Sequence, residues 1–387
     1  MTAAVTERAA AGAPVPVAPL AVTGAAAVTP AGIGLGPLGR AVQSGTPGLT
    51  ADSGAGAGSG TGEEGLPPRP VRTAPELPVA ELIGRKGTRN LDRTTTLSLI
   101  ACRLALDSFG GPAGERAGVV LGTSTGSISS SSGYSLETLR KDPPYLVNPS
   151  LFPHTVMNCA AGQIAIRNGL HGVNATLAGG QLSGVQAIRY ARNALRQGHA
   201  DRLLVGGVEE FCPQSAWAWH RSGALDTDAA VGEGAAVLMV EPEAAAAASG
   251  RPVLARVLAA QVGFAGGGSL AGALAEVIGA ALRRSGTDAS AVGAVSLGST
   301  GQRAVERIEE RGVGFALDGR VPARTVRVKE VVGECFSASG ALQMAALLGV
   351  WQAEGVPAGE IALVTAVGQD GAVGCVVLES GAAGATG

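Results

Sequence analysis

An α/β fold is predicted by two kinds of segment that alternate along the sequence. Apolar runs of strand length, bounded by glycine and proline, recur in both parts of the chain. Between them lie longer segments in which apolar residues repeat every three or four positions, as the buried face of a helix requires. This periodicity by itself predicts an α/β protein with several buried strands.

The composition excludes several classes of protein. The 387 residues are 46% hydrophobic and 16% charged, with a formal net charge of -2, so nucleic acid is not expected as a partner. No apolar run approaches the ~20 residues that span a bilayer, and the N-terminus lacks a secretory signal, so we expect a cytoplasmic protein without membrane contact. The cysteines lie far apart without a CxxC pair, which predicts neither a metal site nor disulfides. They are Cys102, Cys159, Cys212, Cys335 and Cys375.

The first segments set the pattern. Residues 1–16 are rich in alanine and proline and predict a disordered tail. Pro19–Val28 predicts a buried strand, and Leu35–Ser44 a short helix. Between them, Gly34 begins a formal GxGxxG motif that ends at Gly39, which makes a dinucleotide-binding oxidoreductase an alternative. The missing acidic strand end downstream argues against this alternative, and a glycine-rich loop is the other interpretation.

The next stretch alternates loops with buried elements. Residues 51–72 predict a surface loop rather than a domain linker, because the pattern continues on both sides. Leu97–Phe109 predicts a core-facing helix and Gly118–Ser124 a buried strand. The serine-rich run at 127–132 predicts a loop.

Phe152–Ile166 is an apolar segment that contains two chemically interesting side chains. Ala160 and Ala161 would allow close packing of backbones. His154 follows a proline and could be either a structural hydrogen-bonding residue or a catalyst. Cys159 could likewise be a small buried apolar residue or a reactive thiol.

The stretch from Leu170 to Glu210 carries the strongest signal in the sequence. Gly179 and Gly180 permit a sharp turn, a helix follows at the spacing of its apolar residues, and a buried strand ends in Gly-Gly-Val. Gln181 therefore lies at the start of a helix, where backbone N–H groups and the helix dipole would stabilise a thiolate or an oxyanion. An amide at this place cannot act as a nucleophile.

The remaining segments repeat the alternation of strands and helices. A strand at 235–241 closes the first part of the chain. The segments that follow predict a strand, a helix, a strand, a helix and a hairpin, at Val253–Val262, Leu270–Arg284, Val292–Leu297, Ala338–Trp351, and 361–367 with 373–378.

The Gln181 segment resembles the nucleophile region of beta-ketoacyl synthases, the condensing enzymes of the thiolase fold. Counting back from Arg196, Gln197 and Gly198, which match the end of the family's helix, places the family's nucleophilic cysteine at Gln181. Glutamine there resembles the chain length factor, the non-condensing subunit of a type II polyketide synthase. The resemblance implies a thiolase-like fold, with a half at 17–243 and a similar half at 244–382 in a layered αβαβα core.

The resemblance extends to the other catalytic positions of the family, and this sequence departs from the family at each. The family's two histidines fall on Gly298 and on Glu334, and its gating phenylalanine falls on Gln369, whereas Lys329 is retained. Condensation needs a thiolate to carry the acyl chain and imidazole donors to stabilise the enolate. We therefore predict that no catalytic set is intact and that the chain needs no cofactor.

The resemblance also implies partners and a role. We expect a heterodimer with an active ketosynthase, which elongates acyl chains on an acyl carrier protein in type II polyketide or fatty acid-like biosynthesis. The residues expected to line the acyl tunnel are Phe152, Met157, Asn158 and Ala161. Those expected at the interface are Val173, Asn174, Ala175, Thr176 and Leu177. An enzyme of the same fold that uses Cys159, Cys335 or Glu334 remains an alternative.

Overall fold

The computed structural model describes residues 18–50 and 65–381. The expected disordered tail at 1–16 lies outside the described residues, as does most of the expected loop at 51–72. The part of that loop that is described ends in a short strand, β3 (Val71–Arg72), which pairs with β7 (Val231–Gly232).

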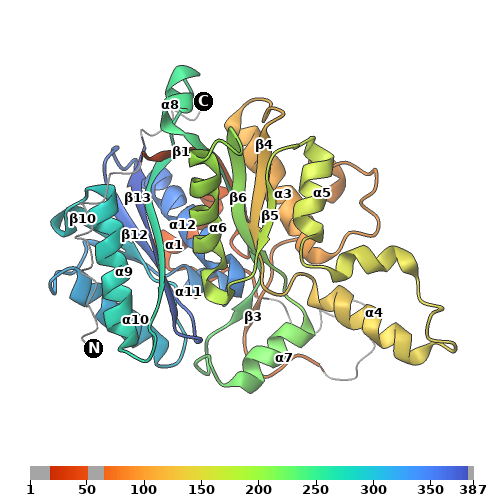
Figure 1. Ribbon diagram of the computed structural model, residues 1–387. Helices are drawn as coiled ribbons and strands as arrows, with labels where there is room; N and C mark the ends of the chain where they lie inside the picture. The colour runs from red at the N-terminus through yellow and green to blue at the C-terminus, as the bar shows by residue number, and fades with distance from the viewer. Residues whose placement is uncertain (1–17, 51–64, 382–387) are drawn as a thin grey trace, which may run out of the picture.

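A large mixed sheet runs through the whole molecule (Figure 1). One half of it has the order β5-β4-β6-β8-β1, formed by Asn174–Leu177, Ala117–Gly122, Arg202–Glu209, Gly234–Pro242 and Leu20–Thr29. The other half has the order β9-β13-β12-β10-β11, formed by Ala255–Phe264, Ala372–Ser380, Ile361–Val367, Val292–Ser296 and Arg324–Val326. The halves are joined where β1 pairs with β9, from Leu20 opposite Val257 to Val22 opposite Ala255. A short strand, β2 (Gly32–Ile33), also pairs with β1.

Helices form three layers around the two half-sheets. The middle layer is α6 (Ser183–Arg196) and α12 (Ser339–Glu354), which share one apolar cluster with strands of both halves. A second cluster lies under α3 (Arg93–Phe109) and α5 (Cys159–Asn168), and a third lies under α9 (Leu270–Ser285) and α10 (Val305–Ala316). These two helix pairs flank the molecule on opposite sides in Figure 1. The result is the αβαβα layering that the resemblance implies.

The central helices approach each other closely at glycines. A Cβ atom on Gly184 of α6 would lie 2.7 Å from the backbone nitrogen of Ala341 in α12, and one on Gly340 would lie 3.1 Å from the nitrogen of Val185. Residues 339–351 of α12 are all buried, as expected for a helix that other elements surround. The starts of the two helices therefore come together inside the molecule.

Several smaller elements complete the chain. Short helices lie at α1 (Leu35–Ser44), α2 (Val79–Leu82), α4 (Ile128–Arg140), α7 (Pro213–Ser222), α8 (Glu243–Ala248) and α11 (Val328–Val332). 3₁₀ helices lie at η1 (Pro149–Thr155), η2 (Gly180–Leu182), η3 (Ala289–Ala291) and η4 (Phe336–Ala338). None of the helices in the described ranges is both long and apolar enough to cross a membrane.

The GxGxxG motif has a packing role. Strand β1, which precedes it, is antiparallel to β2, β8 and β9, so it does not form the parallel βαβ unit of a dinucleotide site. A Cβ atom on Gly39 would lie 2.3 Å from the backbone of Gly349, which means that this glycine lets α1 contact α12. The oxidoreductase alternative is therefore wrong.

The prediction of a loop at 127–132 is also wrong, because these serines begin helix α4. Ser127 caps the helix by accepting from the backbone nitrogen of Ser130. The carboxylate of Glu210 accepts from the backbone nitrogen of Ser129 and from the Ser127 hydroxyl. Serine favours helix caps over helix interiors, so the serine-rich run carries no helical periodicity. The start of the helix also depends on Glu210, which is 83 positions away from Ser127 in the sequence.

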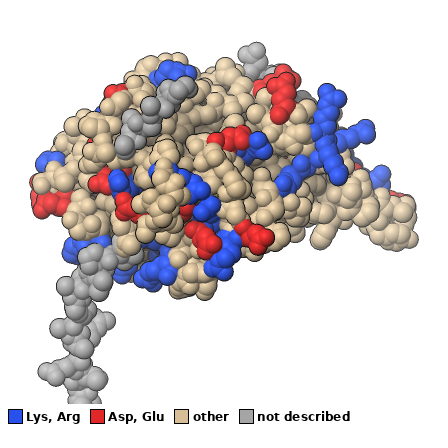
Figure 2. All heavy atoms as spheres, turned by 90° about the horizontal axis from the view of Figure 1, so that it is seen from above, with Lys and Arg blue, Asp and Glu red and all other residues tan. Residues whose placement is uncertain are grey.

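The surface carries both signs of charge. On the face drawn in Figure 2, basic and acidic side chains are interspersed among uncharged ones over much of the area. The ion pairs among the described residues include those of Arg327 with Glu306 and Glu310.

Candidate functional site

Two glycines and two hydroxyls fix the turn that presents Gln181. Gly180 has φ 55°, a left-handed conformation that glycine adopts without strain. Its backbone nitrogen donates to Ser124 Oγ at 2.8 Å, and the nitrogen of Gly179 donates to Ser183 Oγ at 2.9 Å. Gln181 thus lies in η2 near the start of α6, as predicted from the sequence, and only Leu182 separates it from the first residue of that helix.

Gln181 belongs to a buried polar set that we call the Gln181 network: Gln181, Gln302, Lys329 and Glu334. Gln181 Nε2 donates to Glu334 Oε1 at 3.2 Å, and Lys329 Nζ donates to Gln181 Oε1 at 3.2 Å. Lys329 Nζ also lies 2.7 Å from Glu334 Oε2. Gln302 Nε2 donates to the same oxygen at 2.8 Å. The structure therefore brings three predicted site residues into direct contact and adds Gln302.

The residues of the Gln181 network are buried, so their hydrogen bonds form away from water. The four residues are between 1% and 5% exposed, and their polar groups bond to neighbours except for Gln302 Oε1, which is buried without a hydrogen-bond partner among the described residues. Glu334 Oε1 also accepts from the backbone nitrogen of Phe336 at 2.7 Å, at the start of η4. The carboxylate is therefore surrounded by a cation and three N–H donors. Glu334, predicted at the position of the family's second histidine, lies just before η4.

Gly298 lies beside this network rather than in it. A Cβ atom there would lie 2.5 Å from the carbonyl oxygen of Thr365, so the backbone would have to shift before histidine could be accommodated. The nitrogen of Gly298 donates to Glu309 Oε1 at 3.0 Å, and that of Ser299 donates to Glu309 Oε2 at 2.8 Å. Glu309 is fully buried, and burial raises the pKa of its carboxyl group. Sequence reasoning did not single out Glu309, since its partners lie on other elements.

Two cavities meet at Glu334. One, of about 250 Å³, is lined by Trp219, Phe336 and Gln369 together with Glu209 and Glu210. The other, of about 340 Å³, contains charged residues on its wall, which include Arg72, Asp226, Asp228, Lys329 and Glu330. Gln369, predicted at the gate position, therefore lines the same cavity as Phe336. Gln181 lines neither cavity.

The smaller cavity has an acidic wall. Burial raises the pKa of Glu209 to about 7, although Thr125 Oγ1 and the nitrogen of Ser337 donate to its carboxylate. Burial also raises the pKa of Glu210. With a pKa of about 7, Glu209 is partly neutral at pH 7, and only its ionised fraction repels a developing oxyanion.

The cysteines proposed as relocated nucleophiles are poorly suited to that role. Cys335 is 1% exposed, and burial raises its pKa well above the usual value. Burial and the charge of Asp92 raise the pKa of Cys159. A thiol must ionise to attack, so both environments oppose nucleophilic chemistry.

The predicted tunnel residues divide into exposed and buried members. Phe152 and Met157 are 55% and 42% exposed, and Asn158 is exposed at the start of α5. The segment is split between η1 and α5 rather than forming one helix. Ala161, by contrast, is fully buried in the cluster beneath α3 and α5, so its side chain does not reach the surface.

The predicted interface residues lie at an edge of the sheet. Strand β5 pairs in parallel with β4 and is the last strand in the order of its half-sheet. Asn174 is exposed, and Ala175, Thr176 and Leu177 are half-buried. Val173, just before the strand, accepts from the nitrogen of Val119 at 2.7 Å. One side of the β5 ladder is therefore open to pairing with another chain.

The chain is similar to known proteins along most of its length. Residues 18–246 match the family of the beta-ketoacyl synthase N-terminal domain. The 3-oxoacyl-[acyl-carrier-protein] synthase 2 of Vibrio cholerae serotype O1 is 26% identical over 305 residues, 68% of this chain and 70% of that protein. The solved structure of the ishigamide ketosynthase/chain length factor is 32% identical with a TM-score of 0.79, covering 94% of this chain and 99% of that chain. A chain in the solved complex of a type II PKS acyl-carrier protein with its ketosynthase has the same fold at 18% identity. Its TM-score is 0.78, and the match covers 95% of this chain and 100% of that chain.

Proposed function

The chain belongs to the beta-ketoacyl synthase family, and we propose that it acts there as a chain length factor, a subunit that does not condense acyl chains itself. It pairs with a catalytic ketosynthase in a beta-ketoacyl-[acyl-carrier-protein] synthase complex. Together they extend a chain carried by an acyl carrier protein, in type II polyketide or related fatty acid-like biosynthesis.

The observation that carries this proposal is the closed Gln181 network. The amide at the nucleophile position is 4% exposed, and its two ends are bonded to Lys329 and Glu334. An amide forms no thioester, and a carboxylate at the second histidine position repels an enolate. The residues that a condensing site would leave free for substrate are here satisfied by one another.

Two further observations support pairing with another chain. The open edge of β5 offers backbone groups to a partner strand. Phe152, Val156 and Met157 expose apolar side chains on and just after η1. The similar solved structure is named as a ketosynthase/chain length factor, and another similar structure holds a ketosynthase with its acyl-carrier protein.

Reconstitution tests the proposal. This chain is purified alone, then with a ketosynthase that retains its cysteine and both histidines, and each preparation receives malonyl-loaded acyl carrier protein. We expect a one-to-one heterodimer by light scattering, which buries well over ~2,000 Å² as obligate interfaces do. Products form with the pair and not with this chain alone.

Matched variants separate the subunits' roles. Alanine at the partner's catalytic cysteine should abolish condensation, whereas Gln181→Ala should not. Condensation by the isolated chain would overturn the proposal. In that case, mass mapping of acylated thiols would identify Cys159 or Cys335 as a relocated nucleophile.

A further inference from the structure

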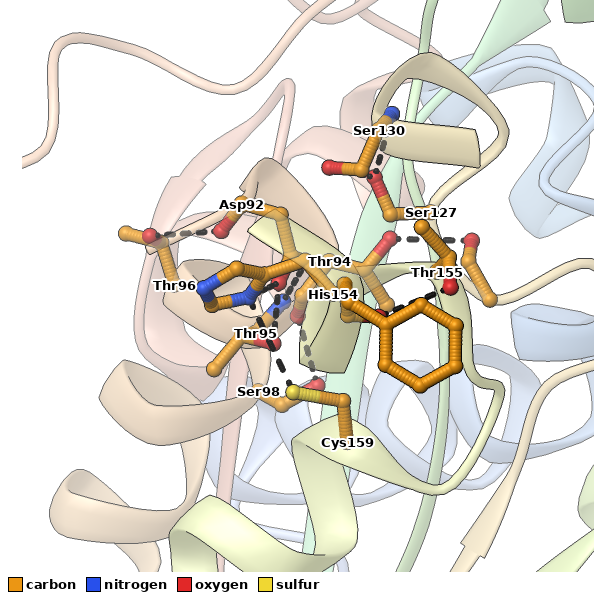
Figure 3. A network of polar contacts seen from close by, with 12 residues as sticks. Asp92, Thr94, Thr95, Thr96, Ser98, Ser127, Ser130, His154, Thr155 and Cys159 are labelled. Atoms are coloured by element: carbon orange, nitrogen blue, oxygen red, sulfur yellow. Dashed lines mark hydrogen bonds and ion pairs between the residues drawn. The ribbon is translucent and has the colours of Figure 1, made fainter. Parts of the chain in front are cut away.

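A second group of chemically active side chains lies outside the Gln181 network. We call Asp92, His154 and Cys159 the Asp92 cluster. Asp92 caps the start of α3, His154 lies in η1, and Cys159 is the first residue of α5. His154 Nδ1 is 2.8 Å from Asp92 Oδ2 and 3.7 Å from Cys159 Sγ. Figure 3 shows the three side chains turned toward one another from their separate elements.

The geometry differs from that of a nucleophilic triad. In a triad, the imidazole uses one nitrogen for the nucleophile and the other for the carboxylate that orients it. Here the same nitrogen, Nδ1 of His154, faces both the carboxylate and the thiol. A single nitrogen cannot relay a proton between two neighbours on its own side, but three ligand atoms gathered around one point can share a cation.

We propose that the Asp92 cluster binds a divalent transition metal ion, for which Zn²⁺ is the best fit. Its oxygen, nitrogen and sulfur atoms all lie within 4.8 Å of one another. A tetrahedral zinc with ordinary bond lengths separates its ligand atoms by about 3.3 to 3.6 Å, so the observed spacings need shifts of only a few tenths of an ångström to about one ångström. Water occupies the fourth position.

The types of ligand select the metal. Thiolate and imidazole suit zinc and its neighbours in the transition series, whereas Mg²⁺ and Ca²⁺ prefer oxygen ligands alone. A thiolate, a carboxylate and a neutral imidazole together balance the two positive charges of the ion. Binding replaces the thiol proton of Cys159 with a sulfur–metal bond and releases that proton to solvent.

The surroundings favour an ordered and accessible site. Asp92 Oδ1 accepts from the backbone nitrogen of Thr95 at 2.7 Å, and Oδ2 accepts from the Thr95 hydroxyl at 2.7 Å, which fixes the carboxylate. The side chains of Asp92 and His154 are 4% and 11% exposed, and Cys159 is half-buried, so an ion can enter through the edge of the cluster. The ion would tie η1 and α5 to α3.

Cobalt provides the direct test, because a thiolate bound to tetrahedral Co²⁺ gives a near-ultraviolet charge-transfer band and strong visible bands. Full-length protein is stripped of metal with a chelator and titrated with Co²⁺. We expect one ion per chain and displacement by Zn²⁺, with no displacement by excess Mg²⁺ or Ca²⁺. Failure of the wild-type chain to bind one Co²⁺ with a charge-transfer band would overturn the proposal.

Variants locate the ion at the cluster. Cys159→Ser should remove the charge-transfer band and weaken Co²⁺ binding at least ~100-fold. Asp92→Asn keeps a preferred helix cap and should weaken binding at least ~10-fold, which decides the matter if the serine variant does not fold. Cys212→Ser is the control, because Cys212 caps α7 and serine is a preferred cap. Unchanged binding in both cluster variants would refute the assignment.

Discussion

The Gln181 network and the Asp92 cluster contain similar chemical groups, but they differ in how many hydrogen-bond partners surround those groups. In the network, the carboxylate of Glu334 accepts from two amides, from the Lys329 ammonium and from the nitrogen of Phe336. In the cluster, one nitrogen of His154 is shared between a carboxylate and a thiol. In the network, Gln181, Lys329 and Glu334 are buried and bond to one another, whereas the cluster is partly accessible, with Cys159 half-buried, and can take a ligand. Reactive residue types are therefore informative only together with what already occupies their hydrogen bonds.

The largest expected effect comes from breaking the ion pair of the network. Lys329→Met leaves Glu334 as a buried charge without its cation, which should lower the free energy of unfolding by about 3–5 kcal/mol in urea denaturation. The double variant with Glu334→Leu should regain much of that loss. As a control, Arg103→Met breaks a half-exposed pair with Asp107 and should cost under about 0.5 kcal/mol. Equal effects for the two single variants would show that the network is hydrated in solution.

The next largest effect is the pH dependence of stability that comes from Glu209, a buried carboxyl group which, unlike Glu334, has no cation beside it among the described residues. Glu209 has a folded pKa of about 7, above its ordinary value of 4.5, so the folded state holds a proton that the unfolded state has lost. Stability should therefore fall as pH rises from 4.5 to 7, by about 3 kcal/mol from this group. Glu209→Gln should remove that part of the pH dependence. A wild-type and a variant curve with the same slope would contradict the assignment.

A smaller effect compares a buried and an exposed member of the predicted tunnel residues, Ala161 and Phe152. Ala161→Leu overpacks the cluster beneath α3 and α5 and should cost about 1–3 kcal/mol of unfolding free energy. Phe152→Ala removes an exposed ring and should change stability by less than about 0.5 kcal/mol, while it alters the length of products made by the reconstituted pair. Thermal unfolding and mass spectrometry of products measure the two effects. Unchanged product lengths for Phe152→Ala and Met157→Ala would place the length control elsewhere.

The smallest expected effect is at the nucleophile position itself. Gln181→Ala removes one hydrogen bond each from Lys329 and Glu334 and should lower condensation by the partner by about 10-fold at most, about 1.4 kcal/mol. Gln181→Cys should not create a second condensing site, because neither histidine is present. Alkylation mapped by mass spectrometry should show this thiol unlabelled in the folded pair. A labelled, acylated Cys at 181 would show that the site still supports nucleophilic chemistry.

Sequence reasoning recovered features that local pattern determines. The helix at Leu35–Ser44 and the turn before Gln181 follow from glycine placement and apolar spacing, and the structure confirms both. Gln181, Lys329 and Glu334 were each singled out from the resemblance, whereas their contact is seen only in the structure. The fold class came from that resemblance, since periodicity predicts strands without their order.

Features that depend on distant partners could not be predicted. Helix α4 begins with serines because Glu210 completes its cap from another strand end. Gln302 was not singled out, because only the folded chain brings it to Glu334. The cysteine spacing gave no sign of the Asp92 cluster, whose members are separated by up to 67 positions and meet through the packing of three elements.

The pairing of β1 has a consequence for synthesis on the ribosome. All ten residues of β1 are buried, yet apart from the two-residue strand β2 its partners are β8 (Gly234–Pro242) and β9 (Ala255–Phe264), which are translated much later. Until those strands emerge, an apolar strand with unpaired backbone groups waits in the nascent chain. Nascent chains stalled before β8 should therefore bind chaperones or aggregate, and those released beyond β9 should begin to resist proteolysis.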